Sequence, residues 1–307
     1  LANLPGANLM HLDWFLEKHI EWGDILNNGG LIDFLYMGVK LGIYPSLIFM
    51  GVGAMTDFTA LISNPKSLLM GAGAQLGVFV AFFGALLLGF SPNEAASIGI
   101  IGGADGPTAI LVTKTLAPAL LGAIAIAAYS YMALIPIIQP PFMRMLTSKK
   151  EREITMTALR PVSQTEKLVF PVLVTIVVSI ILPDAAPLIG FLMFGNLIRE
   201  CGCLNSLSET AQTTLANLIT LVLGITISFS MKADQFVSLQ TLMIMGLGLF
   251  AFIFDSIGGV MFAKFLNLFS KNKVNPMVGA AGISAFPMSA RVIEKMGIAE
   301  DKTNHLL

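Results

Sequence analysis

Long apolar segments separated by short polar connections dominate the hydropathy pattern of this chain. Most of them are near the roughly 20 residues that an α-helix needs to cross the hydrocarbon core of a bilayer. The pattern therefore predicts an all-α polytopic membrane protein surrounded by membrane lipid. Spans are expected at residues 31–54, 67–90, 95–113, 116–138, 168–183, 185–200, 213–231, 240–269 and 275–293.

Residues 1–30 follow a different pattern, in which apolar and aromatic side chains are mixed with polar ones. Such a segment is typical of an amphipathic helix that lies in the membrane interface. The side chains that would anchor it are His11, Trp14, Phe15, Ile20 and Trp22. We therefore expect an interfacial segment at 1–30 and a single transmembrane domain at 31–307.

The apolar segment 95–113 is interrupted by Gly102-Gly103-Ala104-Asp105-Gly106-Pro107-Thr108. A charge at membrane depth costs on the order of 3 kcal/mol, and non-helical backbone survives there only inside protein or beside a wet cavity. Asp105 is therefore predicted to be an ion ligand or a proton relay at the break of a discontinuous helix. The alternative is a loop between two short surface helices, with Asp105 as an ordinary N-cap.

The apolar segment 275–293 is interrupted in a similar way, by Gly279-Ala280-Ala281-Gly282. Backbone carbonyls freed at this break would add to the neutral side-chain oxygens of the same segment. Hard cations favour oxygen ligands, and one carboxylate with several neutral oxygens suits a monovalent cation such as sodium. The neutral side-chain oxygens belong to Asn275, Ser284 and Ser289.

Interruptions in corresponding positions of two halves are typical of inverted-repeat transporters. We therefore expect a transporter-like bundle of two pseudo-repeats, about 31–138 and 168–307, whose two discontinuous helices meet near the membrane midplane. Glycines that only permit close helix packing are the alternative. The connection 139–167 carries six of the 18 lysines and arginines, so the positive-inside rule places it in the cytoplasm. It either sets only the topology or also meets an acidic soluble partner.

Three further polar residues have both a functional and a structural interpretation. Arg291 ends the second interrupted segment, where its planar guanidinium either binds a carboxylate or snorkels to the membrane face. Tyr131 lies inside an apolar helix and either packs there or handles a proton or a cation. Asp255 is a second intramembrane carboxylate, which is either functional or hydrogen-bonded to a neighbouring helix.

Composition supports the membrane assignment and excludes several classes of protein. The chain is 55% hydrophobic and only 12% charged, with a mean hydropathy of +0.79, whereas soluble domains are roughly 25% charged. Its net charge of −1 predicts no nucleic-acid partner. Cys201 and Cys203 are too close for a comfortable disulfide and are expected to be free thiols. No serine elbow, phosphate loop, zinc motif or dinucleotide fingerprint is present.

The two interrupted motifs, Gly102 to Thr108 and Asn275 to Arg291, resemble those of the β subunits of sodium-pumping, biotin-dependent decarboxylases. This family includes the oxaloacetate, methylmalonyl-CoA, glutaconyl-CoA and malonate enzymes, and the likeness covers about residues 34–307. Its members usually have further apolar sequence at both ends, so the family's terminal helices are expected to be absent from these 307 residues.

The resemblance implies a mechanism and a set of partners. A soluble carboxyltransferase loads CO2 onto biotin on a mobile carrier domain. The β subunit decarboxylates the carboxybiotin at the cytoplasmic face, exports sodium and consumes one proton. The implied assembly is a trimer with small γ subunits in the cytoplasmic (inner) membrane of a bacterium or archaeon.

The resemblance also implies roles for individual residues. Asp105 and Asn275 match residues that bind sodium, and Tyr131 and Ser284 match residues that handle ions or protons. Gly279 lies in the interrupted segment 275–293, together with Asn275 and Ser284. Arg291 matches an arginine of the carboxybiotin step. The implied sodium ligands are Asp105, Asn275, Gly279, Ser284 and Tyr131, and the implied catalytic residues are Arg291, Tyr131 and Asp105.

A protein of another class would have a similar sequence. A plain secondary transporter, such as a sodium/proton antiporter or an organic-anion carrier, would also combine apolar spans with interrupted helices. Neighbouring genes for a biotin carrier and a carboxyltransferase would distinguish the two functions. A purely structural membrane scaffold explains none of the polar groups in the spans.

Overall fold

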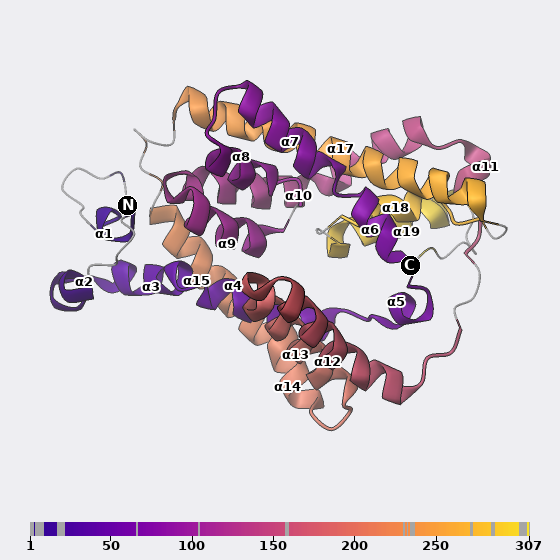
Figure 1. Ribbon diagram of the computed structural model, residues 1–307, viewed down its shortest axis with the longest axis horizontal. Coiled ribbons are helices and arrows are strands. Elements are labelled where there is room, and N and C mark those ends of the chain that lie inside the picture. Colours follow the sequence, from indigo (N-terminus) through magenta and orange to yellow (C-terminus); the bar gives the residue numbers. More distant parts are fainter. Residues whose placement is uncertain are drawn as a thin grey trace. The chain divides into compact units, whose positions relative to one another are not determined.

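The described part of the chain is helical. The computed structural model describes all residues except 1–2, 4–8, 17–21, 66, 104, 157–159, 230, 232, 234–236, 271–272, 284–285, 301–305 and 307 (Figure 1). The residues that it describes include no strand. The prediction of an all-α protein is confirmed.

Among the described residues, five helical segments are long and apolar enough to cross a membrane. A sixth span is possible if α3 (Leu31–Lys40) and α4 (Ile43–Met55), which are bent by 62° at a short break, count as one. The chain is therefore a multi-pass membrane protein. The five segments are Ser67–Leu87, which includes α6 (Ser67–Gly73) and α7 (Leu76–Leu87); Pro118–Leu146, which includes α10 (Leu121–Leu146); α12 (Gln164–Ile181); Asn205–Phe229, from α14 (Asn205–Thr210) to α15 (Ala216–Phe229); and α17 (Leu239–Phe269).

The chain divides into two compact units, and both halves of the sequence contribute to each. The first unit comprises residues 1–65 and 159–236, and the second comprises 66–158 and 237–307. A boundary between consecutive halves of the sequence is therefore not a boundary between the compact units. The pseudo-repeats at 31–138 and 168–307 stay a prediction.

In the first unit, small residues let α4 and α13 (Ala186–Glu200) pack closely. A Cβ atom at Gly195 would lie 2.9 Å from the carbonyl carbon of Met50, and one at Gly53 would lie 2.7 Å from that of Leu192. Asn196 of α13 is buried and donates a 2.9 Å hydrogen bond to the carbonyl of Thr56. Close backbone contact and interhelical hydrogen bonds are the usual means of helix association in a bilayer.

In the second unit, α10 and α17 are the long helices against which the shorter elements pack. Figure 1 shows α7 lying along α17. The shorter elements include both interrupted segments. These are α8 (Pro92–Gly99) followed by α9 (Gly106–Leu116), and α18 (Met277–Ala280) followed by α19 (Phe286–Glu300). Helix α8 begins with a capping box, in which Ser91 and Glu94 satisfy each other's backbone N–H groups.

Helix α10 extends beyond the expected span. We expected the span to end at residue 138, but the helix continues to Leu146, so the first part of the predicted connection 139–167 is helical. Three prolines, Pro136, Pro140 and Pro141, lie inside it. Prolines are tolerated in membrane helices because neighbouring groups satisfy the freed carbonyls. In the described part of the connection that follows, the short α11 (Lys149–Arg152) is the one helix before α12.

In the first thirty residues, where one interfacial helix was expected, the described part includes two helical stretches on either side of residues 17–21. These are α1 (Asp13–Leu16) and α2 (Trp22–Asn28), and parts of 1–30 lie outside the described residues. His11 stacks on Trp14 with ring centroids 4.1 Å apart. Its ring nitrogen lies 3.1 Å from the carboxylate of the buried Asp33 at the start of α3. A membrane-interface position for this segment stays a prediction.

Candidate functional site

The first interruption has Asp105 at its end, as the N-cap of α9. The Thr108 hydroxyl donates a 2.6 Å hydrogen bond to Asp105 Oδ2. Ile101, Gly102 and Gly106 around the break are buried. The break therefore lies in the interior of its unit, and Asp105 is the N-cap of the helix that follows it; the role of Asp105 as an ion ligand stays a prediction.

Two tyrosines of α10 lie near the two ends of this first interruption. A Cβ atom at Gly106 would lie 2.7 Å from the hydroxyl oxygen of Tyr129, so that ring lies directly on the start of α9. A Cβ at Gly248 of α17 would lie 2.8 Å from the ring of Tyr131 and 3.0 Å from Ile101, which precedes the break. Tyr129 is therefore at the Asp105 end and Tyr131 at the other end.

The hydroxyls of these tyrosines differ in their bonding. Tyr131 donates to the carbonyl of Met245 on α17. The buried hydroxyl of Tyr129 has no hydrogen-bond partner among the residues that the structure describes. Motif resemblance pointed to Tyr131, whereas the geometry adds Tyr129 as the phenol next to Asp105. Tyr129 is two positions before Tyr131 in the sequence, but nothing in the sequence indicates which of the two tyrosines faces the break.

The second interruption is held by a buried polar cluster on α10 and α19. Gln139 donates to Ser289 Oγ at 2.7 Å and to the carbonyl of Ala280, the last residue of α18, at 3.1 Å. Ser289 Oγ also lies 2.9 Å from Gln139 Oε1 and 2.9 Å from the Ala280 carbonyl oxygen, and its single hydrogen can serve one of them. Ser289 was a predicted oxygen donor, but Gln139 was missed. A polar residue inside an apolar run was the signal for it.

Asn275 connects the second interruption to the polar segment after α10. Its side-chain amide donates to the carbonyls of Arg152 at 2.8 Å and Ile154 at 3.0 Å. Its side-chain oxygen accepts the N–H of Met277 at 3.1 Å, at the start of α18. Asn275 and Asp105 share no hydrogen-bond partner among the described residues. A direct meeting of the two at one ion stays a prediction.

Both interruptions pack against the middle of α17. A Cβ at Gly102 would lie 3.1 Å from Ala251, and one at Gly279 would lie 2.6 Å from the carbonyl carbon of Gly259. These two contact points are eight residues apart on the helix, about 12 Å at about 1.5 Å per residue. Asp255 lies between them, near the midpoint of this 31-residue helix. The interruptions are thus neighbours along α17.

Asp255 is fully buried and anchors the start of α7. Its Oδ1 accepts the N–H of Gly77 at 2.6 Å, whereas its Oδ2 has no partner among the described residues. A Cβ at Gly102 would lie 2.8 Å from the N atom of Val78, so the first interruption rests on the same turn of α7. Of the two interpretations of Asp255, the hydrogen bond to a neighbouring helix is present.

Arg291 lies on the exposed side of α19. Ser289, Val292 and Ile293 are buried, whereas Arg291 and Lys295, one turn later, are exposed. Among the described residues, none forms an ion pair with Arg291. Ser284, the remaining predicted site residue, lies outside the described residues.

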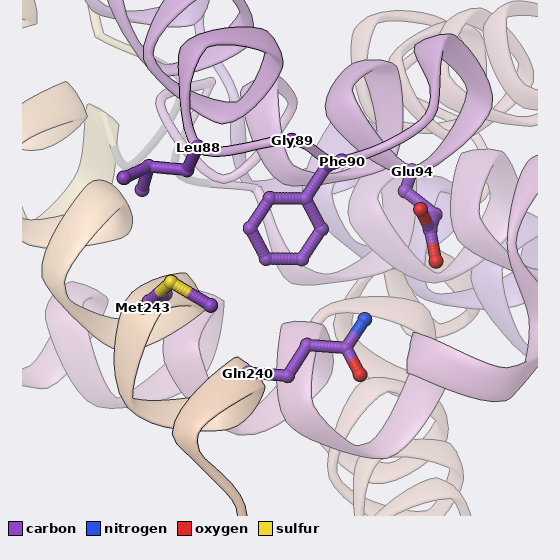
Figure 2. Close-up of a pocket in the computed structure, with 6 residues that line it drawn as sticks. All are labelled: Leu88, Gly89, Phe90, Glu94, Gln240 and Met243. Atoms are coloured by element: carbon purple, nitrogen blue, oxygen red, sulfur yellow. The ribbon is translucent and has the colours of Figure 1, made fainter.

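A surface pocket lies toward the beginning of α17, away from both interruptions (Figure 2). Glu94 is its acidic residue, but its carboxylate accepts the N–H of Ser91 at 2.9 Å and serves as a helix cap. The pocket is at the end of α17 opposite Lys264, which pairs with Glu151 of α11 at 3.0 Å. The lining residues are Leu88, Gly89, Phe90, Glu94, Gln240 and Met243.

The chain matches one protein family over its whole length. Residues 1–307 match the model of the Na+-transporting oxaloacetate decarboxylase beta subunit. A methylmalonyl-CoA decarboxylase subunit beta from Propionigenium modestum is 54% identical over 317 residues, which cover 100% of this chain and 80% of the relative. A glutaconyl-CoA decarboxylase subunit beta from Acidaminococcus fermentans is 54% identical over 278 residues, which cover 91% of this chain and 74% of the relative. An oxaloacetate decarboxylase beta chain from Haemophilus ducreyi is 52% identical over 298 residues, which cover 95% of this chain and 68% of the relative.

Proposed function

Because the chain belongs to the family of β subunits of Na+-transporting decarboxylases, we propose that it decarboxylates carboxybiotin and couples this reaction to sodium export. One observation carries the coupling. Two interrupted helices pack against the middle of α17, and one of them presents a carboxylate at its break. Such breaks provide ion sites inside transporters. The antiporter alternative has no observation in its favour.

We propose Asp105 as the charged ligand of the transported sodium ion. Among the described residues of the break, the backbone carbonyls of Ile101, Gly102 and Gly103 accept no backbone hydrogen bond, and such oxygens complete the coordination of a hard cation. Thr108 holds one carboxylate oxygen at 2.6 Å and thereby orients the group. Tyr131 and Tyr129 border this break, whereas Asn275, Gly279 and Ser284 belong to the second one, which we assign to another stage of the sodium path.

The chemistry of biotin explains why the reaction consumes a proton. Loss of CO2 from carboxybiotin leaves an anion on the ureido ring, which requires a proton. Sodium and a proton compete for one buried carboxylate, because each neutralises its charge. Sodium arriving at Asp105 therefore displaces a proton. We assign that proton to the biotin anion.

Carboxybiotin is an anion, and Arg291 is the group that we propose to hold it. Its fork of donors fits a carboxylate bidentately. The segment around α11 is basic and therefore cytoplasmic, which is the side from which a soluble biotin carrier arrives. The partners that we propose are a carboxyltransferase with a biotin-carrier domain, a small γ-type subunit and further copies of this chain in a trimer. These would assemble at the cytoplasmic membrane of a bacterium or archaeon, and the carboxyltransferase would select the acid.

The test uses the full-length subunit in its complex, reconstituted in liposomes. Carboxybiotin turnover and uptake of radioactive sodium are measured together, in the wild type, Arg291→Lys and the neighbouring control Lys295→Gln. We expect Arg291→Lys to lose turnover while sodium still protects the protein against heat, and Lys295→Gln to retain both. A wild type that moves sodium without any carboxybiotin would contradict the decarboxylase function. Normal turnover in Arg291→Lys would contradict the role of the arginine alone.

A further inference from the structure

The chain contains two cysteines, and they lie in one tight turn at the end of α13. The helix ends at Glu200, and Gly202 has a φ of 71°, so the backbone reverses directly after Cys201. The turn brings the Sγ atoms of Cys201 and Cys203 to 3.6 Å from each other. Cys203 is exposed and Cys201 is half-buried. The two thiols are thus in contact and accessible from one side.

The same turn places hydrogen-bond donors near the Cys201 sulfur. A right-handed residue followed by a left-handed one points successive backbone N–H groups to one side, which forms an anion-binding nest. Here Cys203 donates its S–H to the Cys201 sulfur at 3.6 Å, and the nearby backbone N–H groups and the Cys203 thiol lower the pKa of the Cys201 thiol. The carbonyl of Ile198, 3.0 Å away, accepts the S–H of the neutral form. The hydrogen bond with Cys201 raises the pKa of Cys203, so Cys201 is the first to ionise.

The position of the turn points to a reducing compartment. Glu200, just before it, pairs with Lys167 at 3.6 Å and accepts through its carbonyl from Gln164. The turn therefore lies beside the first turn of α12, directly after the basic connection that the positive-inside rule places in the cytoplasm. Cytosolic disulfides in ordinary cells are transient and serve catalysis or sensing. A structural disulfide is not expected here.

We propose that Cys201 and Cys203 form a redox-sensitive dithiol that small-molecule disulfides oxidise reversibly, with Cys201 as the attacking thiol and Cys203 as the resolving thiol. The Cys201 thiolate attacks one sulfur of the reagent disulfide. A mixed disulfide forms and one reagent thiolate leaves. The Cys203 thiolate then attacks the Cys201 sulfur, closes the Cys201–Cys203 disulfide and expels the second reagent thiolate. The two protein thiols are oxidised, the reagent is reduced to two thiols, and the two cysteine protons end on those thiols.

Closure within three residues forms a small, strained ring at an exposed position. Strained or exposed disulfides are labile and are readily reduced by excess thiol. The oxidised form is therefore a signal that lasts only while the thiol pool is oxidised. Its location next to Arg199, which donates to the Met55 carbonyl at 3.0 Å, links it to the packing of α13 on the end of α4.

The test uses the purified complex with oxidised glutathione as the probe and the mass of this subunit as the readout. Peptide mapping of the subunit assigns each thiol change to Cys201 or Cys203, the two cysteines of this sequence. We expect the wild type to lose both free thiols and to retain no glutathione, and excess dithiothreitol to restore them. Cys203→Ser should retain one glutathione. Cys201→Ser should react about tenfold more slowly, since the thiolate is the reactive form.

Three results would overturn the proposal. One is equal reactivity of the two single variants. Another is a stable glutathione adduct on the wild type. The last is no reaction in the folded complex although both thiols are counted after denaturation. Disulfide-linked dimers on a non-reducing gel would likewise contradict closure within one chain.

Discussion

The side-chain amide of Gln139 on α10 lies 2.7 Å from the hydroxyl oxygen of Ser289 on α19, although 150 residues separate the two in sequence. Both side chains are fully buried. Their shared partner is the carbonyl of Ala280, the last residue of α18. The pair therefore closes the second interruption from both sides, and it sets where α18 ends relative to α19.

Gln139→Leu should destabilise the protein by about 1–3 kcal/mol, because it leaves the Ala280 carbonyl and Ser289 buried with fewer donors. Ser289→Ala should cost about 1 kcal/mol, since Gln139 still reaches Ala280. Thermal unfolding of the complex in detergent measures both. Ser206→Ala, an exposed serine of α14, serves as the control. Equal Tm values for Gln139→Leu and the wild type would show that the cluster does not hold the break.

Asp105→Asn should abolish sodium-stimulated turnover while the protein stays folded, because the amide lacks the charge that binds a cation. Thr108→Val should raise the half-saturating sodium concentration by up to about tenfold, since it removes a hydrogen bond worth about 1–1.5 kcal/mol that orients the carboxylate. Thr115→Val on the exposed face of α9 is the matched control. Unchanged sodium dependence in Asp105→Asn would remove Asp105 from the sodium site.

Substituting the two tyrosines of α10 should have different effects on stability and on sodium affinity. Tyr131→Phe removes a hydrogen bond to Met245 and should lower stability by about 1 kcal/mol. Tyr129→Phe removes a hydroxyl with no partner among the described residues, so stability should hold while the apparent sodium affinity falls. Sodium titrations of turnover and thermal unfolding are compared for both. If Tyr129→Phe matches the wild type in both measurements, its hydroxyl has no role at Asp105.

Asp255→Leu should destabilise the protein by about 1–3 kcal/mol, because it leaves the Gly77 N–H in the first turn of α7 buried without its acceptor. Asp255→Asn keeps an acceptor for the Gly77 N–H and should cost about 1 kcal/mol. The neighbouring Ser256→Ala is the control, since that hydroxyl is buried without a partner among the described residues. A stable Asp255→Leu protein that has lost sodium dependence would favour the functional interpretation of this carboxylate.

Arg152 and Glu300 form a partly buried ion pair of 2.7 Å that joins α11 to the end of α19. A double-mutant cycle with Arg152→Ala and Glu300→Ala should give a coupling energy of about 1 kcal/mol, reduced in high salt. The ion pair fixes the segment whose Arg152 backbone carbonyl accepts from Asn275, so Arg152→Ala should raise the half-saturating sodium concentration by loosening that segment. The exposed Lys149–Glu153 pair, 3.8 Å apart, gives a comparison cycle with little coupling. Equal coupling in the two cycles would argue against a special role for Arg152.

The sequence by itself determined the class of the protein and the location of its two interruptions. Runs of about 20 apolar residues become membrane helices because a bilayer offers the backbone no other hydrogen-bond partners. Glycine and proline within such a run, with Asp105 beside them, mark a break because they disfavour continued helix. These are local properties, and they are read from neighbouring residues alone. The motif resemblance at the two breaks likewise led to the correct family.

Only the tertiary structure decided which side chains meet across the fold. Tyr129 and Tyr131 are two positions apart, so at about 100° per residue they point to nearly opposite sides of α10. Which side faces Asp105 depends on the rotation of α10 against α9 and α17. Gln139 forms a hydrogen bond with Ser289, and Asp33 forms one with His11. In each pair the two residues are far apart in sequence and are brought together by packing. Such pairings depend on helix packing and rotation, for which a hydrophobic pattern with one buried stripe per helix carries too little information.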